Sequence, residues 1–450
     1  MNVLVVSHGC RLSRAEQDAA SAVLAACGHV LVDRAEAADL LLLDTCAVTH
    51  RADADARKAV RRAVRANPNL RVILSGCYAE LDPAACRALP GVVAVAGNRA
   101  KAANLLRAIA HDGECTDPPE QGPPLVPAAR LAAGLAVGAG RTGPWPAVDA
   151  LPAARPHARA RALLRVQDGC DYGCSYCIVP RVRGPSRSLP LGEACRRFEA
   201  LVADGAPEVV LTGAHLGTYG RDLRPRRTLA DLLGALVARA GRTRIRLSSL
   251  DPHELDDALL DVIRRAPDRV CPHLHLPLQS GDDGVLRRMR RVYAARAFGD
   301  AAARARRALP DVTLGTDVIA GFPGEDEAAF EATVACLEDS GVDYVHAFAF
   351  SARPGTPAAE LEPTVPPEET RRRVARLRAL GARRQARLRA RWAGRVVDVV
   401  LDKAPRRGTL RAVSSAFVAY EVAGDGGAHA GARARGRVAP CGTKVALLAP

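Results

Sequence analysis

Three cysteines within eight residues constrain the possible structures of this chain more than any other feature of its sequence. Cys170, Cys174 and Cys177 have the spacing C-x3-C-x2-C. Thiolates this close together on one loop can hold three irons of a [4Fe–4S] cube and leave the fourth iron open for an exchangeable ligand. A structural zinc ion would require a fourth protein ligand, and no suitable residue is adjacent. The spacing therefore favours an iron–sulfur cluster, with a structural zinc site as the alternative.

Three further cysteines are far apart in the sequence, yet each follows a predicted strand by one to three residues. They are Cys10, Cys46 and Cys77. In an open parallel sheet the carboxyl ends of the strands converge on one edge, which is also where ligands bind. We therefore expect these thiols to meet and to hold a second [4Fe–4S] cluster. Three unrelated loop cysteines are the alternative, because distant spacing alone does not define a site.

The N-terminal part of the chain alternates between short apolar runs typical of strands and longer runs of helical periodicity. The strands are expected at 3–7, 40–43 and 72–75, and the helices at 15–26, 54–65 and after Pro83. Such alternation is typical of an open parallel α/β sheet, which we assign to residues 1–114. Residues 115–160 are dominated by Pro, Gly and Ala and are interpreted as a linker.

A second series of six strand–helix units predicts a partial TIM-like (β/α)6 barrel at residues 161–390. Its strands are expected at 163–167, 209–212, 245–248, 273–278, 313–319 and 344–350. Residues 391–450 alternate like short strands and predict a small β-barrel. Its strands are expected at 396–401, 417–422 and 445–448. The fold class is therefore α/β, with a small β domain at the C-terminus.

Positive charge is concentrated near the end of the predicted barrel domain. The net charge of the chain is +15, and residues 371–395 hold eleven arginines and no acid. Val374, Leu377 and Leu388 recur in this segment at roughly helical spacing. A basic amphipathic helix suits a polyanionic partner such as RNA. A solvated helix face in an Arg-rich protein is the alternative.

Cysteine usage and hydropathy indicate a cytoplasmic protein. Thirteen cysteines in a chain of 450 residues argue for metal ligation rather than for a disulfide framework. No apolar run approaches the roughly 18 residues that a membrane span needs, and the opening run at 3–6 is too short for a secretory signal. We therefore expect no membrane association.

Seven short motifs in the first 360 residues resemble those of one enzyme family. They lie at 9–12, 44–49, 75–80, 167–170, 211–215, 275–281 and 321–325. The loop of Cys170 resembles that of the radical S-adenosylmethionine superfamily, in which Tyr176 would fill the aromatic position beside the adenine of the cofactor. Over its whole length the chain is similar to the methylthiotransferases of the MiaB/RimO type. That resemblance implies an N-terminal three-cysteine domain, a radical barrel and a C-terminal TRAM β-barrel.

The resemblance also implies the cofactors and the chemistry. S-adenosylmethionine would bind the open iron of the cluster at Cys170, Cys174 and Cys177, and its reductive cleavage would give a 5′-deoxyadenosyl radical. The second [4Fe–4S] cluster would supply or carry the sulfur. One S-adenosylmethionine would methylate that sulfur, and another would activate the substrate carbon. An electron donor such as flavodoxin or ferredoxin is implied, while the sulfur donor stays open.

Four residues at or near predicted strand ends are candidate cofactor contacts, because the reactive groups of such barrels lie at the carboxyl ends of the strands. Thr212 and Gly213 end the second strand, where a backbone without a bulky side chain can approach the methionine ammonium. Gln279 closes the fourth strand, and Asp317 lies within the fifth. An ordinary structural role is the alternative for each of them.

The motifs look most like the MtaB-like branch of the family, which acts on threonylcarbamoyladenosine in tRNA. We therefore expect addition of a methylthio group to C2 of N6-threonylcarbamoyladenosine next to the anticodon. No side-chain base can remove a proton from this aromatic carbon, which is the physical need for a radical. The alternatives are isopentenyladenosine in tRNA, an aspartate of ribosomal protein S12 and, in a different class, a non-catalytic iron–sulfur protein that binds RNA.

Overall fold

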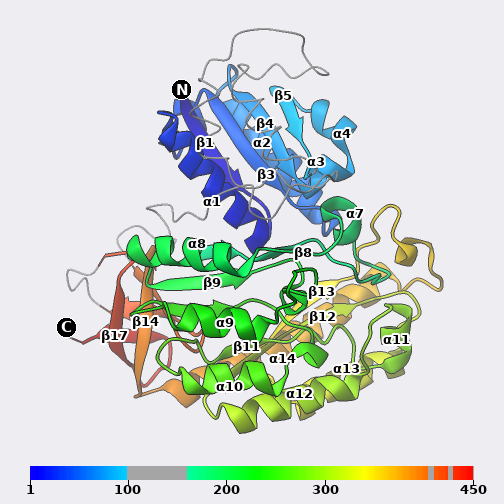
Figure 1. Cartoon of the computed structure of the whole chain (residues 1–450). Coiled ribbons are helices and arrows are strands. Elements are labelled where there is room, and N and C mark those ends of the chain that lie inside the picture. Colours follow the sequence, from blue (N-terminus) through cyan, green and yellow to red (C-terminus); the bar gives the residue numbers. More distant parts are fainter. Residues whose placement is uncertain (99–159, 404–409, 424–428, 449–450) are drawn as a thin grey trace.

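The computed structural model describes residues 1–98, 160–403, 410–423 and 429–448. Figure 1 shows an N-terminal sheet with helices in blue, a large body of strands and helices in green to orange, and a C-terminal β-barrel in orange to red. The predicted linker at 115–160 lies outside the described residues except for its last residue. The domain limits proposed from the sequence remain a proposal.

The N-terminal body is a parallel sheet with the strand order β2-β1-β3-β4-β5. Its strands are β1 (Asn2–Ser7), β2 (Val30–Val32), β3 (Leu40–Thr45), β4 (Arg71–Gly76) and β5 (Val92–Ala96). Its helices are α1 (Arg11–Ala26), α2 (His50–Ala66), α3 (Cys77–Leu81) and α4 (Pro83–Arg87), with a 3-10 turn, η1 (Ala35–Ala37). Every residue of β3 is buried, because helices cover both faces of the sheet. The two edge strands, β2 and β5, were not predicted from the sequence.

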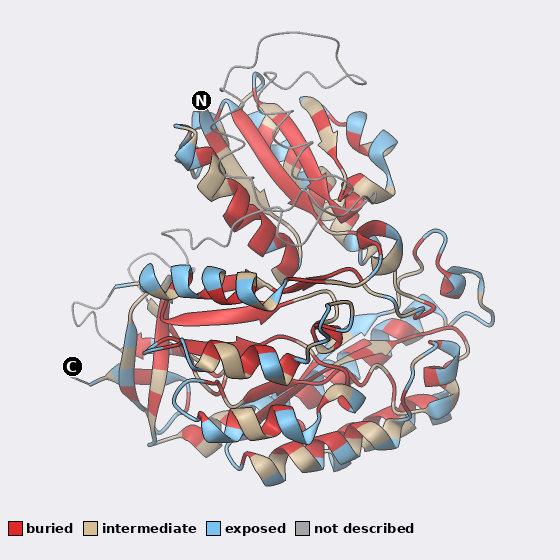
Figure 2. Cartoon of the chain, viewed as in Figure 1, coloured by how far each residue is buried: buried red, intermediate tan, exposed pale blue. Residues whose placement is uncertain are grey.

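The central body is an open barrel of parallel strands with helices outside it. Two sheets, β10-β9-β6 and β11-β12-β13, form its wall. The strands are β6 (Ala162–Arg165), β9 (Glu208–Thr212), β10 (Arg244–Leu247), β11 (His273–His275), β12 (Thr313–Ala320) and β13 (Tyr344–Ala349). Figure 2 shows these strands mostly buried, while the surrounding helices expose their outer faces. The predicted six-stranded partial barrel is confirmed.

Helices and short turns join the barrel strands. The helices are α7 (Val179–Arg183), α8 (Leu191–Ala203), α9 (Leu229–Val237), α10 (Asp257–Arg265), α11 (Asp283–Arg288), α12 (Ala295–Ala308), α13 (Glu327–Asp339) and α14 (Pro367–Trp392). The 3-10 turns are η2 (Leu216–Thr218), η3 (Pro252–Glu254) and η4 (Pro357–Glu360). A small antiparallel ladder of β7 (Gln167–Asp168) and β8 (Arg187–Ser188) flanks the loop that carries the cysteine triplet.

One barrel strand is shorter than the sequence predicts. The expected strand covers 273–278, whereas β11 ends at His275. Pro277 has no backbone N–H to continue a ladder, and Gln279 adopts a positive φ of 66°. Gln279 therefore lies four residues beyond β11 and does not close that strand as predicted, although it pairs with Val318 of β12 in an isolated bridge.

The C-terminal body is a closed barrel in the order β14-β15-β16-β18-β17, which confirms the predicted small β-barrel. Its strands are β14 (Val396–Lys403), β15 (Leu410–Ser414), β16 (Ala419–Ala423), β17 (Arg433–Val438) and β18 (Lys444–Leu447). Leu388 and Trp392, at the end of α14, pack into its core. The last helix of the central body is therefore continuous with the hydrophobic core of the C-terminal body.

The arginine-rich segment forms helix α14, as predicted, but much of its charge is neutralised within the protein. Val374, Leu377 and Leu388 are buried. Arg372 contacts Glu327, with an N–O distance of 2.9 Å, and Arg376 pairs with Glu331 of the same helix, α13. Four other arginines of the helix are exposed, namely Arg371, Arg378, Arg383 and Arg387. The helix thus uses one basic row to pack on α13 and presents another to solvent.

The described cysteines form no disulfide. Cys115 lies outside the described residues. No helix in the described part of the chain is both long and apolar enough to cross a membrane.

Candidate functional site

The loop of Cys170, Cys174 and Cys177 is held in a fixed shape at the carboxyl end of the barrel. The N–H of Cys170 donates to the carbonyl of Gly184, and that of Cys177 to the carbonyl of Cys174, both at 3.0 Å. Gly169 has a φ of +69°, and a Cβ there would lie 1.9 Å from the carbonyl oxygen of Pro185. Only glycine fits this position, so the backbone is set for the three thiols before any ligand binds.

Cationic and hydrogen-bonding groups surround the sulfur atoms of this loop. Nη1 of Arg291 lies 3.2 Å from Sγ of Cys174, and Nδ1 of His215 lies 3.4 Å from Sγ of Cys170. The backbone N–H of Tyr172 also points at Sγ of Cys170, at 3.4 Å. Donors aimed at sulfur are the partners that tune an anionic iron–sulfur cluster.

His215 connects the loop to two acids of the barrel. Its Nε2 lies 2.9 Å from Glu254 and 3.7 Å from Asp251. Burial alone would lower the pKa of His215, but the hydrogen bonds to Cys170 and Glu254 outweigh burial and raise the pKa to about 10. The two acids therefore favour the protonated form of the imidazole. Neither His215 nor Arg291 was singled out from the sequence, although His215 comes three residues after a predicted strand end.

The residues present fit a [4Fe–4S] cluster better than a single ion. In the described structure, the sulfur atoms of Cys170, Cys174 and Cys177 do not all lie within 4.8 Å of one another, as three ligands of a single ion would. Burial raises the pKa of Cys177 to about 12 and so disfavours its thiolate, which is the form that binds a metal. Ser248, just after β10, has a buried hydroxyl oxygen with no hydrogen-bond partner in the described structure. Such an atom suits a polar ligand bound over the strand ends.

Tyr176 lies against the turn after β12. Its ring is 6.5 Å from that of Phe322, in an edge-to-face arrangement, and Phe350 packs on Phe322 from another side. This places the predicted adenine-side aromatic residue in an apolar cluster beside the cysteine loop. The arrangement provides an aromatic wall for a flat base.

Thr212 and Gly213 lie at the carboxyl end of β9, as predicted. The side chain of Thr212 is buried. A Cβ at Gly213 would lie 2.6 Å from Oε1 of Gln167, which accepts a hydrogen bond from the N–H of His215 at 2.7 Å. The close packing of Gln167 therefore explains why residue 213 is a glycine.

Asp317 lies between two histidines inside the barrel. Its Oδ1 is 3.2 Å from Nε2 of His275 and 3.2 Å from Nδ1 of His346. Burial alone would raise the pKa of Asp317, but the hydrogen bonds from the two histidines outweigh it and hold the pKa well below its usual range. These three residues are the one group in the described structure whose ligand atoms lie within 4.8 Å of one another. Sequence reasoning found Asp317 but neither histidine.

The N-terminal domain brings Cys10, Cys46 and Cys77 to one edge of its sheet. They follow β1, β3 and β4, which are adjacent strands. Burial raises the pKa of Cys46 to about 12, and the nearby thiols of Cys77 and Cys10 add to the rise. Nδ2 of Asn98 lies 3.4 Å from Sγ of Cys77. The three thiols are therefore neighbours in space, despite separations of more than thirty residues along the chain.

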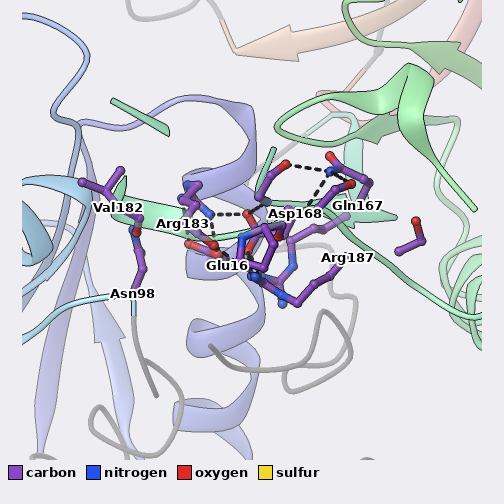
Figure 3. A network of polar contacts seen from close by, with 12 residues as sticks. Glu16, Asn98, Gln167, Asp168, Val182, Arg183 and Arg187 are labelled. Atoms are coloured by element: carbon purple, nitrogen blue, oxygen red, sulfur yellow. Dashed lines mark hydrogen bonds and ion pairs between the residues drawn. The ribbon is translucent and has the colours of Figure 1, made fainter. Parts of the chain in front are cut away.

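A buried ion network links this edge to the other cysteine loop (Figure 3). Nη1 of Arg183 lies 3.0 Å from Glu16 of α1 and 3.1 Å from Asp168, two residues before Cys170. Arg165 makes a second contact with Glu16, at 2.9 Å. Arg183 is buried among these groups and lies within electrostatic range of Cys10 and Cys77. The network fixes one cysteine site relative to the other.

Two family models match the chain. The model described as "Radical SAM superfamily" covers residues 164–337. The model described as "Uncharacterized protein family UPF0004" covers residues 2–97. The matched regions contain the two cysteine sets, one in each.

The chain is also similar to curated proteins over most of its length. It is 34% identical to the threonylcarbamoyladenosine tRNA methylthiotransferase MtaB of Bacillus subtilis, over 88% of this chain and 84% of that protein. It is 31% identical to the protein of the same name from Thermotoga maritima, over 94% and 92%. The tRNA-2-methylthio-N(6)-dimethylallyladenosine synthase of Acidothermus cellulolyticus is 33% identical, over 90% and 78%.

Among solved structures, the radical S-adenosylmethionine methyltransferase TsrM of Kitasatospora setae shares the fold. The TM-score is 0.56 at 16% identity, over 79% of this chain and 74% of that chain. The family implies S-adenosylmethionine and one [4Fe–4S] cluster as cofactors. With its two matched domains and its identity to curated relatives, the chain belongs to the radical S-adenosylmethionine tRNA methylthiotransferase family.

Proposed function

We propose that this enzyme adds a methylthio group to C2 of N6-threonylcarbamoyladenosine next to the anticodon of tRNA. The observation that carries the proposal is the joining of two three-cysteine sites by the buried contacts of Arg183. Relatives at 31–34% identity that bear this activity in their names support the choice of substrate.

We assign the first cluster to Cys170, Cys174 and Cys177, and a second [4Fe–4S] cluster to Cys10, Cys46 and Cys77. The second assignment rests on their common sheet edge. When bound, the first cluster and S-adenosylmethionine supply the one-electron chemistry that activates a carbon–hydrogen bond. The residues of the chain hold and orient the reacting groups.

The roles of individual residues follow from their contacts. Arg291 and His215 place positive charge beside the sulfurs of the first site and stabilise its anionic state. Tyr176 forms the aromatic wall for the adenine of the cofactor. Thr212 and Gly213 lie at the carboxyl end of β9, Gln279 pairs with β12, and Asp317 lies within β12; all four are proposed as cofactor contacts.

Basic residues on the N-terminal domain suit the RNA partner. A cavity of about 490 Å³ beside α2 is lined by Arg51, Lys58 and Arg62, by Asp55, which pairs with Arg51, and by His8, two residues before Cys10. Lysine and arginine side chains neutralise phosphates and position an RNA. A single-stranded anticodon loop can present an unstacked base to a pocket. We further propose a cytoplasmic enzyme that takes electrons from a donor such as flavodoxin or ferredoxin.

A second candidate substrate is dimethylallyladenosine at the same tRNA position, because several similar proteins are named for it. Ribosomal protein S12 is less favoured, because the basic residues of α2 and α14 have no evident use with a protein substrate. A non-catalytic RNA-binding protein would need no S-adenosylmethionine.

The test uses full-length protein reconstituted anaerobically with iron and sulfide. It is incubated with S-adenosylmethionine, a reductant and anticodon stem-loop RNA that carries threonylcarbamoyladenosine or dimethylallyladenosine. We expect mass spectrometry to show a methylthio group on the first RNA. If only the RNA with dimethylallyladenosine is modified, that nucleoside is the substrate instead. If no reaction yields 5′-deoxyadenosine, the protein is not a radical S-adenosylmethionine enzyme.

A further inference from the structure

Arg11 is a partly buried cation for which the described structure holds no anionic partner. It is the first residue of α1, directly after Cys10, and its guanidinium points at the ring of Phe417, 5.9 Å from the centroid. Among the described residues it makes no hydrogen bond through its side chain and no ion pair. It lies within electrostatic range of Tyr344, Asp317 and Glu208, and of a second cation, Arg246.

Glu208, the first residue of β9, is already neutralised by other arginines. The carboxylate oxygens of Glu208 lie 2.7 Å from a guanidinium nitrogen of Arg244, 2.8 Å from one of Arg246 and 3.8 Å from one of Arg161. Arg244 also pairs with Asp398 at 3.2 Å, so these arginines share two acids, and neither acid pairs with Arg11. A cation in a low-dielectric interior is costly unless an anion accompanies it.

The other acid, Asp317, is held by His275 and His346. It is also within electrostatic range of Arg11 but forms no ion pair with it. Asp317, Glu208 and Asp398 therefore each have other partners, and none of them forms an ion pair with Arg11. An anionic ligand would supply the partner that Arg11 lacks.

Aromatic rings border the same space. The rings of His273 and Tyr344 stack, with centroids 6.0 Å apart, and Phe417 lies 4.4 Å from His273. His346 lies 5.1 Å from Tyr344 and is partly exposed, so this group is open on one side. Phe417 has a φ of +61°, a rare conformation for an aromatic residue. Such strain is often retained where a side chain serves a binding site.

We propose that Arg11 binds the carboxylate of the substrate's N6 side chain and thereby selects threonylcarbamoyladenosine; this inference rests on the proposed function. C2 and C6 are the two neighbours of N1 in the adenine ring, so the bonds that leave C2 and C6 point in diverging directions. A base with C2 toward the cysteine loop at the carboxyl ends of the strands can therefore extend its N6 side chain into the barrel. Dimethylallyladenosine has no carboxylate and would leave Arg11 without an anion.

Three anions are compatible with this guanidinium: the substrate carboxylate, an RNA phosphate and the carboxylate of S-adenosylmethionine. Two stem-loop RNAs distinguish the substrate carboxylate from a phosphate. One carries threonylcarbamoyladenosine and the other carries its neutral methyl ester, so they differ in the carboxylate but have the same phosphates. Formation of 5′-deoxyadenosine in the absence of RNA reports on the third.

The experiment compares Arg11→Gln, Arg11→Lys and the wild type as reconstituted full-length proteins. Arg14→Gln is the matched control, because Arg14 is exposed one turn further along the same helix. For the wild type we expect kcat/KM to be about ten- to a hundredfold higher with the acid than with the ester, as for loss of a charge-assisted hydrogen bond. Arg11→Gln should lose this preference, Arg11→Lys should keep part of it, and Arg14→Gln should keep all of it.

Several outcomes would overturn the inference without touching the proposed function. The inference is wrong if the wild type uses the RNA with threonylcarbamoyladenosine and the RNA with its methyl ester equally well. This outcome needs no Arg11 variant, so it holds even if every variant fails to bind iron. Equal loss on both RNAs in Arg11→Gln would assign Arg11 to a phosphate. Loss of RNA-independent 5′-deoxyadenosine formation, with iron retained, would assign it to S-adenosylmethionine. Failure of the wild type on acid and ester alike, with dimethylallyladenosine modified, would instead refute the proposed function.

Discussion

The two cysteine sites are assembled by different means. The site of Cys170, Cys174 and Cys177 is contained in one loop, with its shape set by neighbours such as Gly169 and Gly184. The site of Cys10, Cys46 and Cys77 exists only because β1, β3 and β4 lie side by side. A local sequence pattern is enough to define the first site, whereas the second depends on the fold of a whole domain.

Removal of the thiols gives the largest effect and the clearest separation of the two sites. Alanine at Cys170, Cys174 and Cys177 should reduce the iron content from about eight to about four per chain and abolish 5′-deoxyadenosine formation. Alanine at Cys10, Cys46 and Cys77 should reduce the iron equally but leave 5′-deoxyadenosine formation intact. Iron analysis and chromatography of the nucleoside products measure both. A loss of all iron in the first variant would mean that the N-terminal cysteines hold no cluster of their own.

The Arg183 network tests whether the two sites must be held together. Arg183→Met removes one partner of a buried ion group, which costs about 3–5 kcal/mol of unfolding free energy. We expect urea unfolding to show this loss, and methylthio transfer to fall more than 5′-deoxyadenosine formation. The control is Arg34→Met, whose exposed contact with Glu36 is worth less than about 1 kcal/mol. Equal losses of both activities would indicate that the network serves stability alone.

Glu208 tests the attachment of the C-terminal barrel, because its partners Arg244 and Arg246 also donate hydrogen bonds to carbonyl oxygens of β15, at Val413 and Ser414. Burial would raise the pKa of Glu208, but Arg246 and Arg244 outweigh it and hold the pKa far below its usual range. A depressed pKa stabilises the folded state above the ordinary value of about 4.3, and this contribution is lost as the pH falls below it. Glu208→Gln should therefore destabilise the protein by about 3 kcal/mol at pH 7 and flatten the acid limb of a plot of stability against pH. An unchanged acid limb would contradict this.

Asn98 gives the smallest expected effect. Its side chain donates to the carbonyl oxygen of Val182 at 2.7 Å, and to Sγ of Cys77. Asn98→Ala should cost about 1–2 kcal/mol, because a buried carbonyl loses its donor. It should also speed the loss of iron from the N-terminal site to a chelator, while the Cys170 site is unaffected. Asn69→Ala, at an exposed position, is the control. Equal chelator rates in the two variants would separate Asn98 from the metal site.

The sequence predicted the elements that carry periodic or closely spaced signals. The six barrel strands, the arginine helix and the Cys170 triplet belong to this group, whereas Cys10, Cys46 and Cys77 were proposed from the predicted strands that they follow. The partners of those ligands were missed, because their positions depend on long-range packing. Arg291 reaches Cys174 across 117 residues of chain, and Arg183 reaches Glu16 across 167. The edge strands β2 and β5 were missed because they are short and less buried, which weakens the apolar pattern.

The ion pairs between α14 and α13 should make RNA binding less sensitive to salt concentration. Each phosphate neutralised by a free arginine releases a condensed counterion, and the logarithm of the binding constant falls by about 0.7–0.9 per contact for each decade of salt. Arg372 and Arg376 are already occupied by Glu327 and Glu331, so they release few counterions. A titration over salt concentration should therefore give a shallower slope than the eleven arginines of residues 371–395 suggest.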